Sequence, residues 1–230
     1  WALFLDGMGY SAVEIGELMA LFGLVRVIAP NVWGALGDYT GRRMTLLRLG
    51  CAICFVVFAN IFWVEGFLSM ALLMVGYGFF WAAVLPQFEV VTLNYLKEKT
   101  DDYSKIRIWG SLGFVVTVLL LGLLFDSISV AALPVFMLVL LLAILLSSLV
   151  VRSEKQVGKE GGGAGFLALL LRPSVLAFLS AAFLMQFSHG AYYTFFSLFL
   201  QRHEYDNSWI GLLWALGVLA EVIVFLVIHR

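Results

Sequence analysis

The chain has 230 residues, of which 63% are hydrophobic and 13% charged, and its formal net charge is −1. Soluble domains are typically about 45–50% apolar, so the composition excludes an ordinary soluble domain, and the near-zero charge excludes a surface built for nucleic acid. The apolar residues form long unbroken runs rather than a stripe repeating every 3.6 residues, which is typical of helices in contact with lipid. The sequence therefore predicts an all-α, polytopic membrane protein.

Seven apolar segments are long enough to cross a bilayer, whose hydrocarbon core requires about 20 residues of helix. They are bounded by charges and Gly/Pro clusters, and they cover residues 13–36, 44–64, 67–96, 106–125, 129–151, 174–200 and 208–229. Residues 1–5, Trp-Ala-Leu-Phe-Leu, resemble the end of an earlier helix. We therefore expect the chain to be a fragment in which a first helix is cut short.

Basic residues are distributed unequally between the two sets of helix ends. Twelve of the fourteen Lys and Arg residues lie at or near alternate ends: Arg42, Arg43, Arg48, Lys97, Lys99, Lys105, Arg107, Arg152, Lys155, Lys159, Arg172 and Arg230. Arg202 lies at the other set of ends, and Arg26 lies within a span. Because cytoplasmic loops carry the excess of Lys and Arg, we expect the basic loops in the cytoplasm and residues 6–11 outside.

Residues 152–165 form a long polar, glycine-rich stretch, which is typical of a flexible linker. The stretch predicts an N-terminal bundle at 1–151 that lacks most of its first helix, a cytoplasmic linker at 152–172, and the first two helices of a second bundle at 173–230. Cys51 and Cys54 form a C-x-x-C within an apolar run, where packing as small hydrophobes is favoured over a redox or zinc site. We therefore expect no metal and no cofactor.

The loop after the first span carries glycine and charge at defined spacing, and it reads Gly34-Ala-Leu-Gly-Asp38-Tyr-Thr-Gly41-Arg42-Arg43-Met-Thr-Leu46. Gly34 and Gly41 would allow a close helix approach and a tight turn. Asp38 at a helix end can accept charge-assisted hydrogen bonds from an arginine or from a neighbouring helix N-terminus. Such a cluster can latch one conformation. The alternative is that Arg42 and Arg43 only anchor the cytoplasmic side.

A second polar pattern spans two helices: Pro86-Gln-Phe-Glu89, then Tyr103-Ser-Lys105-Ile-Arg107-Ile-Trp109-Gly110-Ser111-Leu-Gly113-Phe114. Glu89 lies eight residues inside its span, or about 12 Å deep at 1.5 Å per residue. An unpaired carboxylate at that depth is costly, so a cationic partner such as Arg107 is expected.

These patterns resemble a known family. The loop matches the G-x-L-x-D-x-x-G-R-[RK]-x-x-L signature of the major facilitator superfamily at every constrained position. The second pattern is similar to the lactose permease and phenylpropionate permease branch, and the segments 186–193 and 210–221 resemble the phenylpropionate permease type. The resemblance implies a major-facilitator-type helical bundle of twelve helices, of which this chain holds a remnant of helix 1 and helices 2–8.

The resemblance also implies roles for single residues. Glu89 and Arg107 match a carboxylate and an arginine that form a charged pair in or beside the substrate cavity; alternatively, the pair only closes the cytoplasmic side. Phe114 stands where the lactose permease has a sugar-stacking tryptophan, so a galactoside is not implied. Glu221 matches a carboxylate that couples sugar binding to proton transfer.

Four further residues within the spans are candidates for binding or proton transfer. Arg26 lies near mid-span with no acidic residue one turn away, so an anionic substrate would suit it. Alternatively, Glu89, Glu221 or an acidic residue in the absent part of the protein could neutralise it. His189 could share proton transfer with Glu221 or could be a neutral packing residue. Tyr192 and Tyr193 are candidate substrate contacts.

The leading hypothesis is a secondary active transporter that couples a small organic solute, such as an aromatic acid, a glycoside or a nucleoside-like compound, to proton symport by alternating access. The alternative is a proton-antiport exporter on the same fold, because a fold does not fix direction or substrate. A receptor or enzyme is disfavoured, since the sequence contains no H-E-x-x-H, G-x-S-x-G or P-loop pattern. The expected partners are the solute, protons and the lipid bilayer of a bacterial inner membrane, with no nucleic acid and a monomeric state.

Overall fold

In the computed structural model, the described residues are 1–96, 103–151 and 171–228, except that the side chains of Ser104 and of residues 224–228 lie outside the description. The helices are α1 (Ala2–Gly7), α2 (Ala12–Thr40), α3 (Arg43–Ala59), α4 (Gly66–Leu96), α5 (Tyr103–Phe125), α6 (Leu133–Val150), α8 (Pro173–Arg202) and α9 (Asn207–Ile228). Two short 3-10 helices, η1 (Asn60–Trp63) and η3 (Val130–Ala132), extend the ends of α3 and α6. Each of the seven predicted spans therefore coincides with a long helix.

Five of these helical segments are long and apolar enough to cross a membrane: Arg43–Trp63, Gly66–Leu96, Lys105–Phe125, Val130–Val150 and Pro173–Arg202. The other two predicted spans are α2 and α9. The described side chains of α9 form an apolar helix over Asn207–Ile223. Helix α2 has 29 residues and includes Glu14, Glu17, Arg26 and Asp38. The composition and the helix lengths together identify an integral membrane protein.

The ends of α2 show how local sequence sets a helix boundary. Ser11 and Glu14 form a capping box, in which the Glu14 carboxylate accepts from the Ser11 backbone N–H at 2.8 Å and Ser11 Oγ accepts from the Glu14 N–H at 3.3 Å. At the other end Gly41 takes a φ of 62°, in the left-handed region that glycine adopts without steric cost. The tight turn expected at Gly41 is confirmed.

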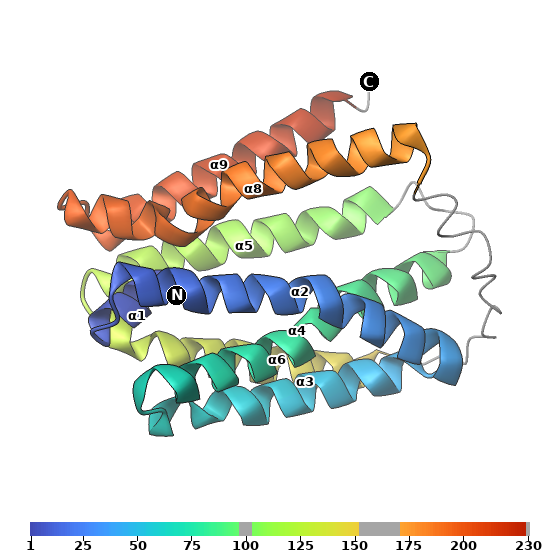
Figure 1. Ribbon diagram of the computed structural model, residues 1–230, viewed down its shortest axis with the longest axis horizontal. Coiled ribbons are helices and arrows are strands. Elements are labelled where there is room, and N and C mark those ends of the chain that lie inside the picture. The colour runs from blue at the N-terminus through green and yellow to red at the C-terminus, as the bar shows by residue number, and fades with distance from the viewer. Residues whose placement is uncertain (97–102, 152–170, 229–230) are drawn as a thin grey trace.

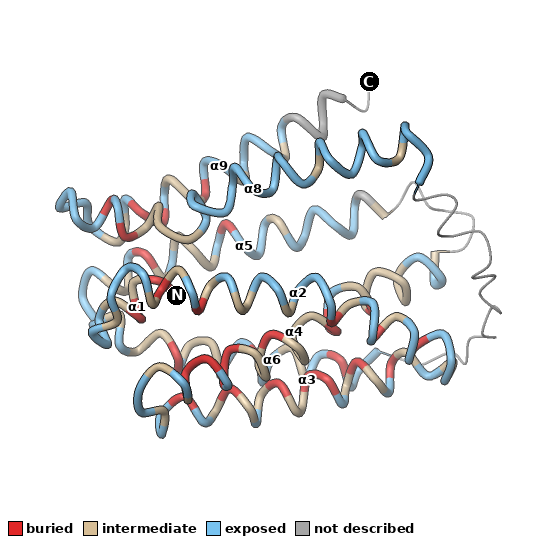
Figure 2. Tube along the Cα trace, in the orientation of Figure 1, coloured by how far each residue is buried: buried red, intermediate tan, exposed pale blue. Residues whose placement is uncertain are grey.

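The helices lie side by side along one direction (Figure 1). Helix α4 packs against both α2 and α3, α3 packs against α6, and α5 packs mainly against α9. The largest core cluster, which includes Leu5, Leu18, Phe58, Met70 and Met74, joins α1, α2, α3 and α4. Figure 2 shows the buried residues gathered in this part, whereas α8 is exposed along most of its length.

The two ends of the bundle differ in charge. We call one end the basic end, because the α2–α3 turn, the start of α5 and the start of α8 place Arg42, Arg43, Arg107 and Arg172 there (Figure 1). The opposite end holds α1, the end of α5 and the α8–α9 turn with Arg202. The predicted alternation of charge is thus present in the bundle. The side of the membrane on which the basic end lies stays a prediction, and the predicted linker at 152–172 lies outside the described residues except for 171 and 172.

Candidate functional site

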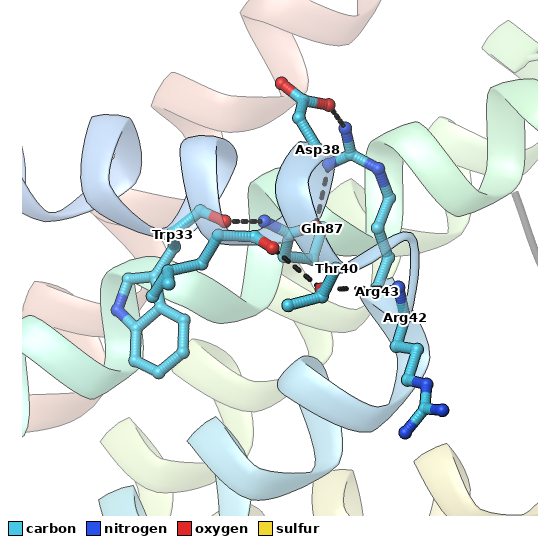
Figure 3. A network of polar contacts seen from close by, with 7 residues as sticks. Trp33, Asp38, Thr40, Arg42, Arg43 and Gln87 are labelled. Atoms are coloured by element: carbon cyan, nitrogen blue, oxygen red, sulfur yellow. Dashed lines mark hydrogen bonds and ion pairs between the residues drawn. The ribbon is translucent and has the colours of Figure 1, made fainter. Parts of the chain in front are cut away.

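The α2–α3 turn carries a polar network that reaches into α4 (Figure 3). Arg43 forms an ion pair with Asp38 through Nη2. Its Nη1 donates a hydrogen bond to Gln87 Oε1 at 2.9 Å. The Gln87 side chain is 1% exposed, and its Nε2 donates to the Trp33 carbonyl at 2.8 Å. The aspartate and one arginine of the loop motif are therefore joined to the helix that carries Glu89.

A close approach of side chains from α3 and α4 is found at Gly37. A Cβ at Gly37 would lie 3.0 Å from Arg43 Nη1 and 3.1 Å from Gln87 Oε1, so the absence of a side chain makes room for the network. A Cβ at Gly34 would have no neighbour within 4 Å among the described residues. The close helix approach at Gly34 therefore stays a prediction, and the approach seen among the described residues is the one at Gly37.

The two motif arginines differ in their surroundings. Arg43 points toward Asp38, whereas the exposed Arg42 side chain points away from the network in Figure 3. The Arg42 backbone N–H donates to Thr40 Oγ1 at 3.3 Å, and the Thr40 hydroxyl donates to the Leu36 carbonyl at 2.7 Å. Arg42 thus fits the alternative of a membrane-edge anchor, whereas Arg43 fits the latch.

Glu89 and Arg107 are linked by Tyr103 at the basic end. The Tyr103 side chain hydrogen-bonds with both the Glu89 carboxylate and the Arg107 guanidinium. Partial burial raises the pKa of Tyr103, and the charge and hydrogen bond of Glu89 raise it further, while Arg107 opposes the shift. Because the hydroxyl can donate to the carboxylate and accept from the guanidinium, Tyr103 bridges the predicted pair.

Arg26 lies on α2 about 21 Å from the Thr40 end, at 1.5 Å per residue. Its guanidinium carbon lies 5.8 Å from the centroid of the Phe22 ring. Phe22 stacks on Tyr77 of α4 at 5.9 Å, and Tyr77 stacks on Trp81 at 6.0 Å. No carboxylate oxygen lies within 4.0 Å of Arg26 among the described residues.

A cavity of about 200 Å³ lies beside this aromatic stack. Six side chains line it, all of them apolar or aromatic: Trp1, Met19, Phe22, Met74, Tyr77 and Met137. Arg26 follows Phe22 by one helical turn, so the exposed cation lies toward the basic end from the cavity. The region therefore combines an apolar wall with one positive charge.

Helices α8 and α9 carry a second aromatic group. Tyr193 stacks on Trp214 at 5.9 Å, and Tyr192 lies 5.4 Å from the same indole ring. His189 lies 5.7 Å from Tyr193, and its Nδ1 is 2.7 Å from the Met185 carbonyl oxygen. A ring nitrogen this close to a carbonyl oxygen is compatible with the tautomer that has its proton on Nδ1, which would donate to the residue's own helix.

The two remaining predicted site residues, Phe114 and Glu221, are exposed. Phe114 is 43% exposed on α5, and Glu221 is exposed on α9. The predicted site residues thus fall into separate parts of the described bundle. These parts are Arg26, the Glu89–Tyr103–Arg107 group and the Tyr192–Tyr193 group. Cys51 and Cys54 are free and buried, and no group of metal-binding side chains occurs among the described residues.

Three residues of the polar and aromatic networks described above were not predicted from the sequence to be functional. Gln87, Trp33 and Tyr103 are polar or aromatic residues within or beside apolar spans, a pattern that occurs by chance at many packing positions. The sequence could have predicted a polar contact at Gln87, because an amide side chain buried in a membrane span requires hydrogen-bond partners.

Comparisons with known proteins agree with one another. The profile of the family described as "MFS_1 like family" matches residues 1–230. The protein named "Probable 3-phenylpropionic acid transporter" of Escherichia coli (strain K12) is 31% identical over 236 residues, covering 98% of this chain and 60% of that protein. "Maltose permease" of Geobacillus stearothermophilus is 32% identical over 122 residues, covering 53% of this chain and 31% of that protein.

A solved structure is also similar. The "Crystal structure of nucleoside transporter NupG" has a TM-score of 0.78 to this chain at 16% sequence identity, covering 99% of this chain and 61% of that one. At that identity the likeness shows the fold. The chain spans about 60% of the length of the Escherichia coli relative and of the solved structure.

Proposed function

Because the chain belongs to the MFS_1 like family, we propose that the protein is a secondary active transporter that takes up a small aromatic carboxylate together with a proton. The family membership agrees with the major-facilitator signature at Gly34–Leu46 and with the all-α bundle. We further propose that the protein lies in a bacterial inner membrane as a monomer, with the basic end in the cytoplasm.

Arg26 is the observation that supports an anionic substrate. A charged side chain near the centre of a membrane helix costs about 2.5–3.5 kcal/mol, so it is retained where it pairs with another charge or with a ligand. The Arg26 guanidinium lies over the face of the Phe22 ring. No carboxylate oxygen lies within 4.0 Å of it among the described residues. A carboxylate on the substrate would supply the missing negative charge.

The rings beside Arg26 support an aromatic group on that substrate. Phe22, Tyr77 and Trp81 form a continuous stack that borders the apolar cavity. Aromatic rings pack favourably against such a stack in offset or edge-on geometry. The substrate class in the name of the Escherichia coli relative is compatible with this combination. A sugar or a nucleoside would use the rings but would leave the guanidinium without a counter-charge.

The proton would be carried by Glu221, with His189 as the second candidate. An ionisable side chain within a membrane span is costly and is retained mainly for function, and a carboxyl can carry a proton. The Nδ1 contact of His189 with its own helix fixes the ring and favours Glu221 as the carrier.

Transport by proteoliposomes tests the proposal. With the protein from the complete gene, external 3-phenylpropionate should be taken up and should make the external medium alkaline, as expected for symport. Maltose and uridine serve as the comparison solutes. Acidification of the medium would establish the antiport alternative, and the absence of any proton movement with transported solute would reject proton coupling.

A further inference from the structure

Helix α4 carries the segment Gly76-Tyr77-Gly78 where it packs against both α2 and α3. A Cβ at Gly76 would lie 3.2 Å from Val57 Cγ1 of α3, and a Cβ at Gly78 would lie 2.8 Å from Phe22 Cδ2 of α2. Small residues are the usual means by which membrane helices approach one another closely. The two glycines therefore bring α2 and α3 close to α4 on either side of Tyr77.

Three aromatic rings surround the ring of Tyr77. The Phe22 ring of α2 is nearly parallel to it, with an interplanar angle of 9° and a centroid distance of 5.9 Å. The Phe58 ring of α3 lies at 5.0 Å, and the Trp81 ring, one turn further along α4, lies at 6.0 Å. A side chain packed between rings from three helices has little freedom to change rotamer. The direction of the Tyr77 phenol group is therefore fixed by packing.

The Tyr77 hydroxyl has no hydrogen-bond partner among the described residues. Every buried side-chain nitrogen and oxygen atom in the described part of the chain does have a partner, so this hydroxyl is not sealed between packed side chains. Tyr77 lines the apolar cavity. The other donor among the lining side chains, the Trp1 indole N–H, donates to Met74 Sδ at 3.5 Å. Tyr77 thus offers the cavity a donor that the described bundle does not use.

Arg26 and Tyr77 lie against the same Phe22 ring. The guanidinium carbon of Arg26 is 5.8 Å from the centroid of that ring, on which Tyr77 stacks. The charge of Arg26 also interacts with the Tyr77 hydroxyl. A guanidinium and a phenol O–H both donate to ionised oxygen, so the two groups together suit the two oxygens of a carboxylate.

We propose that Tyr77 is a specificity-determining residue of the transporter, whose hydroxyl donates to one carboxylate oxygen of the solute while Arg26 binds the other. The inference rests on the proposed function and adds to it a second contact, from α4, with the same carboxylate. A solute with a neutral carbonyl group would use the hydroxyl but not the charge. The pair therefore favours an acid over its amide.

Tyr77→Phe tests the proposal, because it removes the hydroxyl and keeps the packed ring. The substitution leaves no described group without a partner, so the unfolding temperature in detergent should equal that of the parent. With the protein from the complete gene in lipid nanodiscs, titration calorimetry should show an affinity for 3-phenylpropionate that is about tenfold lower or more, as expected for a hydrogen bond to a charged oxygen. A lower unfolding temperature with unchanged affinity would show that the hydroxyl is structural and would overturn the proposal.

Two comparisons make this test specific. Tyr95→Phe removes a hydroxyl from an 80% exposed tyrosine on the same helix, and it should leave the affinity at the parent value. 3-Phenylpropanamide keeps the carbonyl acceptor but lacks the charge, so Tyr77→Phe should weaken its binding by a smaller factor than that of the acid. Equal losses of affinity in Tyr77→Phe and Tyr95→Phe would contradict a role of the cavity hydroxyl.

A double-mutant cycle with Arg26→Gln tests whether both side chains bind the same group. Effects of residues that share a partner are not additive. Without the Arg26 charge the carboxylate is no longer held beside the hydroxyl, so Tyr77→Phe should lower the affinity by about threefold or less in the Arg26→Gln background. The same loss in both backgrounds would assign the hydroxyl to another part of the solute and overturn the proposal.

The behaviour of the parent separates this inference from the proposed function. If the parent and Tyr77→Phe bind 3-phenylpropionate with the same affinity, the role of Tyr77 is rejected and the proposed substrate class stands. If the parent does not bind 3-phenylpropionate, the proposed function is overturned and this inference with it.

Discussion

The Arg43 guanidinium donates a hydrogen bond to the buried Gln87 amide at 2.9 Å and thereby ties the α2–α3 turn to the helix that carries Glu89. Gln87 lies two residues from Glu89 and one after Pro86, whose ring removes a backbone donor from the helix. The network therefore joins the α2–α3 turn to α4 beside the residue at which that helix lacks a backbone donor.

Gln87→Leu should destabilise the protein, because it leaves the Trp33 carbonyl and one Arg43 donor without their partner. Loss of a buried hydrogen bond of this kind costs about 1–3 kcal/mol. Thermal unfolding in detergent measures the effect. A melting temperature of Gln87→Leu equal to that of the parent would show that the network does not stabilise the bundle.

Gly37→Ala should weaken the same network through a change on α2, where Gly37 faces the Arg43 and Gln87 side chains. The added methyl would meet Arg43 Nη1 at 3.0 Å and Gln87 Oε1 at 3.1 Å, so both side chains must shift. Gly34→Ala is the control at the neighbouring motif glycine, whose Cβ meets nothing described within 4 Å. Unfolding temperatures should fall for Gly37→Ala more than for Gly34→Ala. The reverse order would contradict the account of this turn.

The positions of the helices could be predicted from the sequence, whereas the site contacts could be predicted only in part. Apolar runs fix helices in a membrane because every backbone group must be paired within the segment, and so the predicted spans match α2 to α9. The pairing of Glu89 with Arg107 was expected from charge, but the Tyr103 bridge depends on how the start of α5 sits against α4. The hydrogen bond from the Ser208 backbone N–H to the Asp126 carboxylate brings together residues 82 positions apart, a relationship that no local pattern encodes.

Tyr103→Phe should lower the unfolding temperature of the protein. The substitution removes the hydroxyl that hydrogen-bonds with both Glu89 and Arg107 but retains the ring. Hydrogen bonds to charged groups are among the stronger ones in proteins, so their loss should destabilise the contact between α4 and α5. Thermal unfolding in detergent measures the effect. An unfolding temperature equal to that of the parent would show that the Tyr103 bridge does not stabilise this contact.

The role assigned to Arg26 is tested most directly by comparing the binding of 3-phenylpropionate and of 3-phenylpropan-1-ol, which share the ring and chain but differ in charge. Titration calorimetry in nanodiscs should give a loss of about tenfold or more for the carboxylate in Arg26→Gln, a smaller loss in Arg26→Lys, and no change for the alcohol. Equal effects of Arg26→Gln on both ligands, or no effect on the carboxylate, would contradict an anionic substrate paired with Arg26.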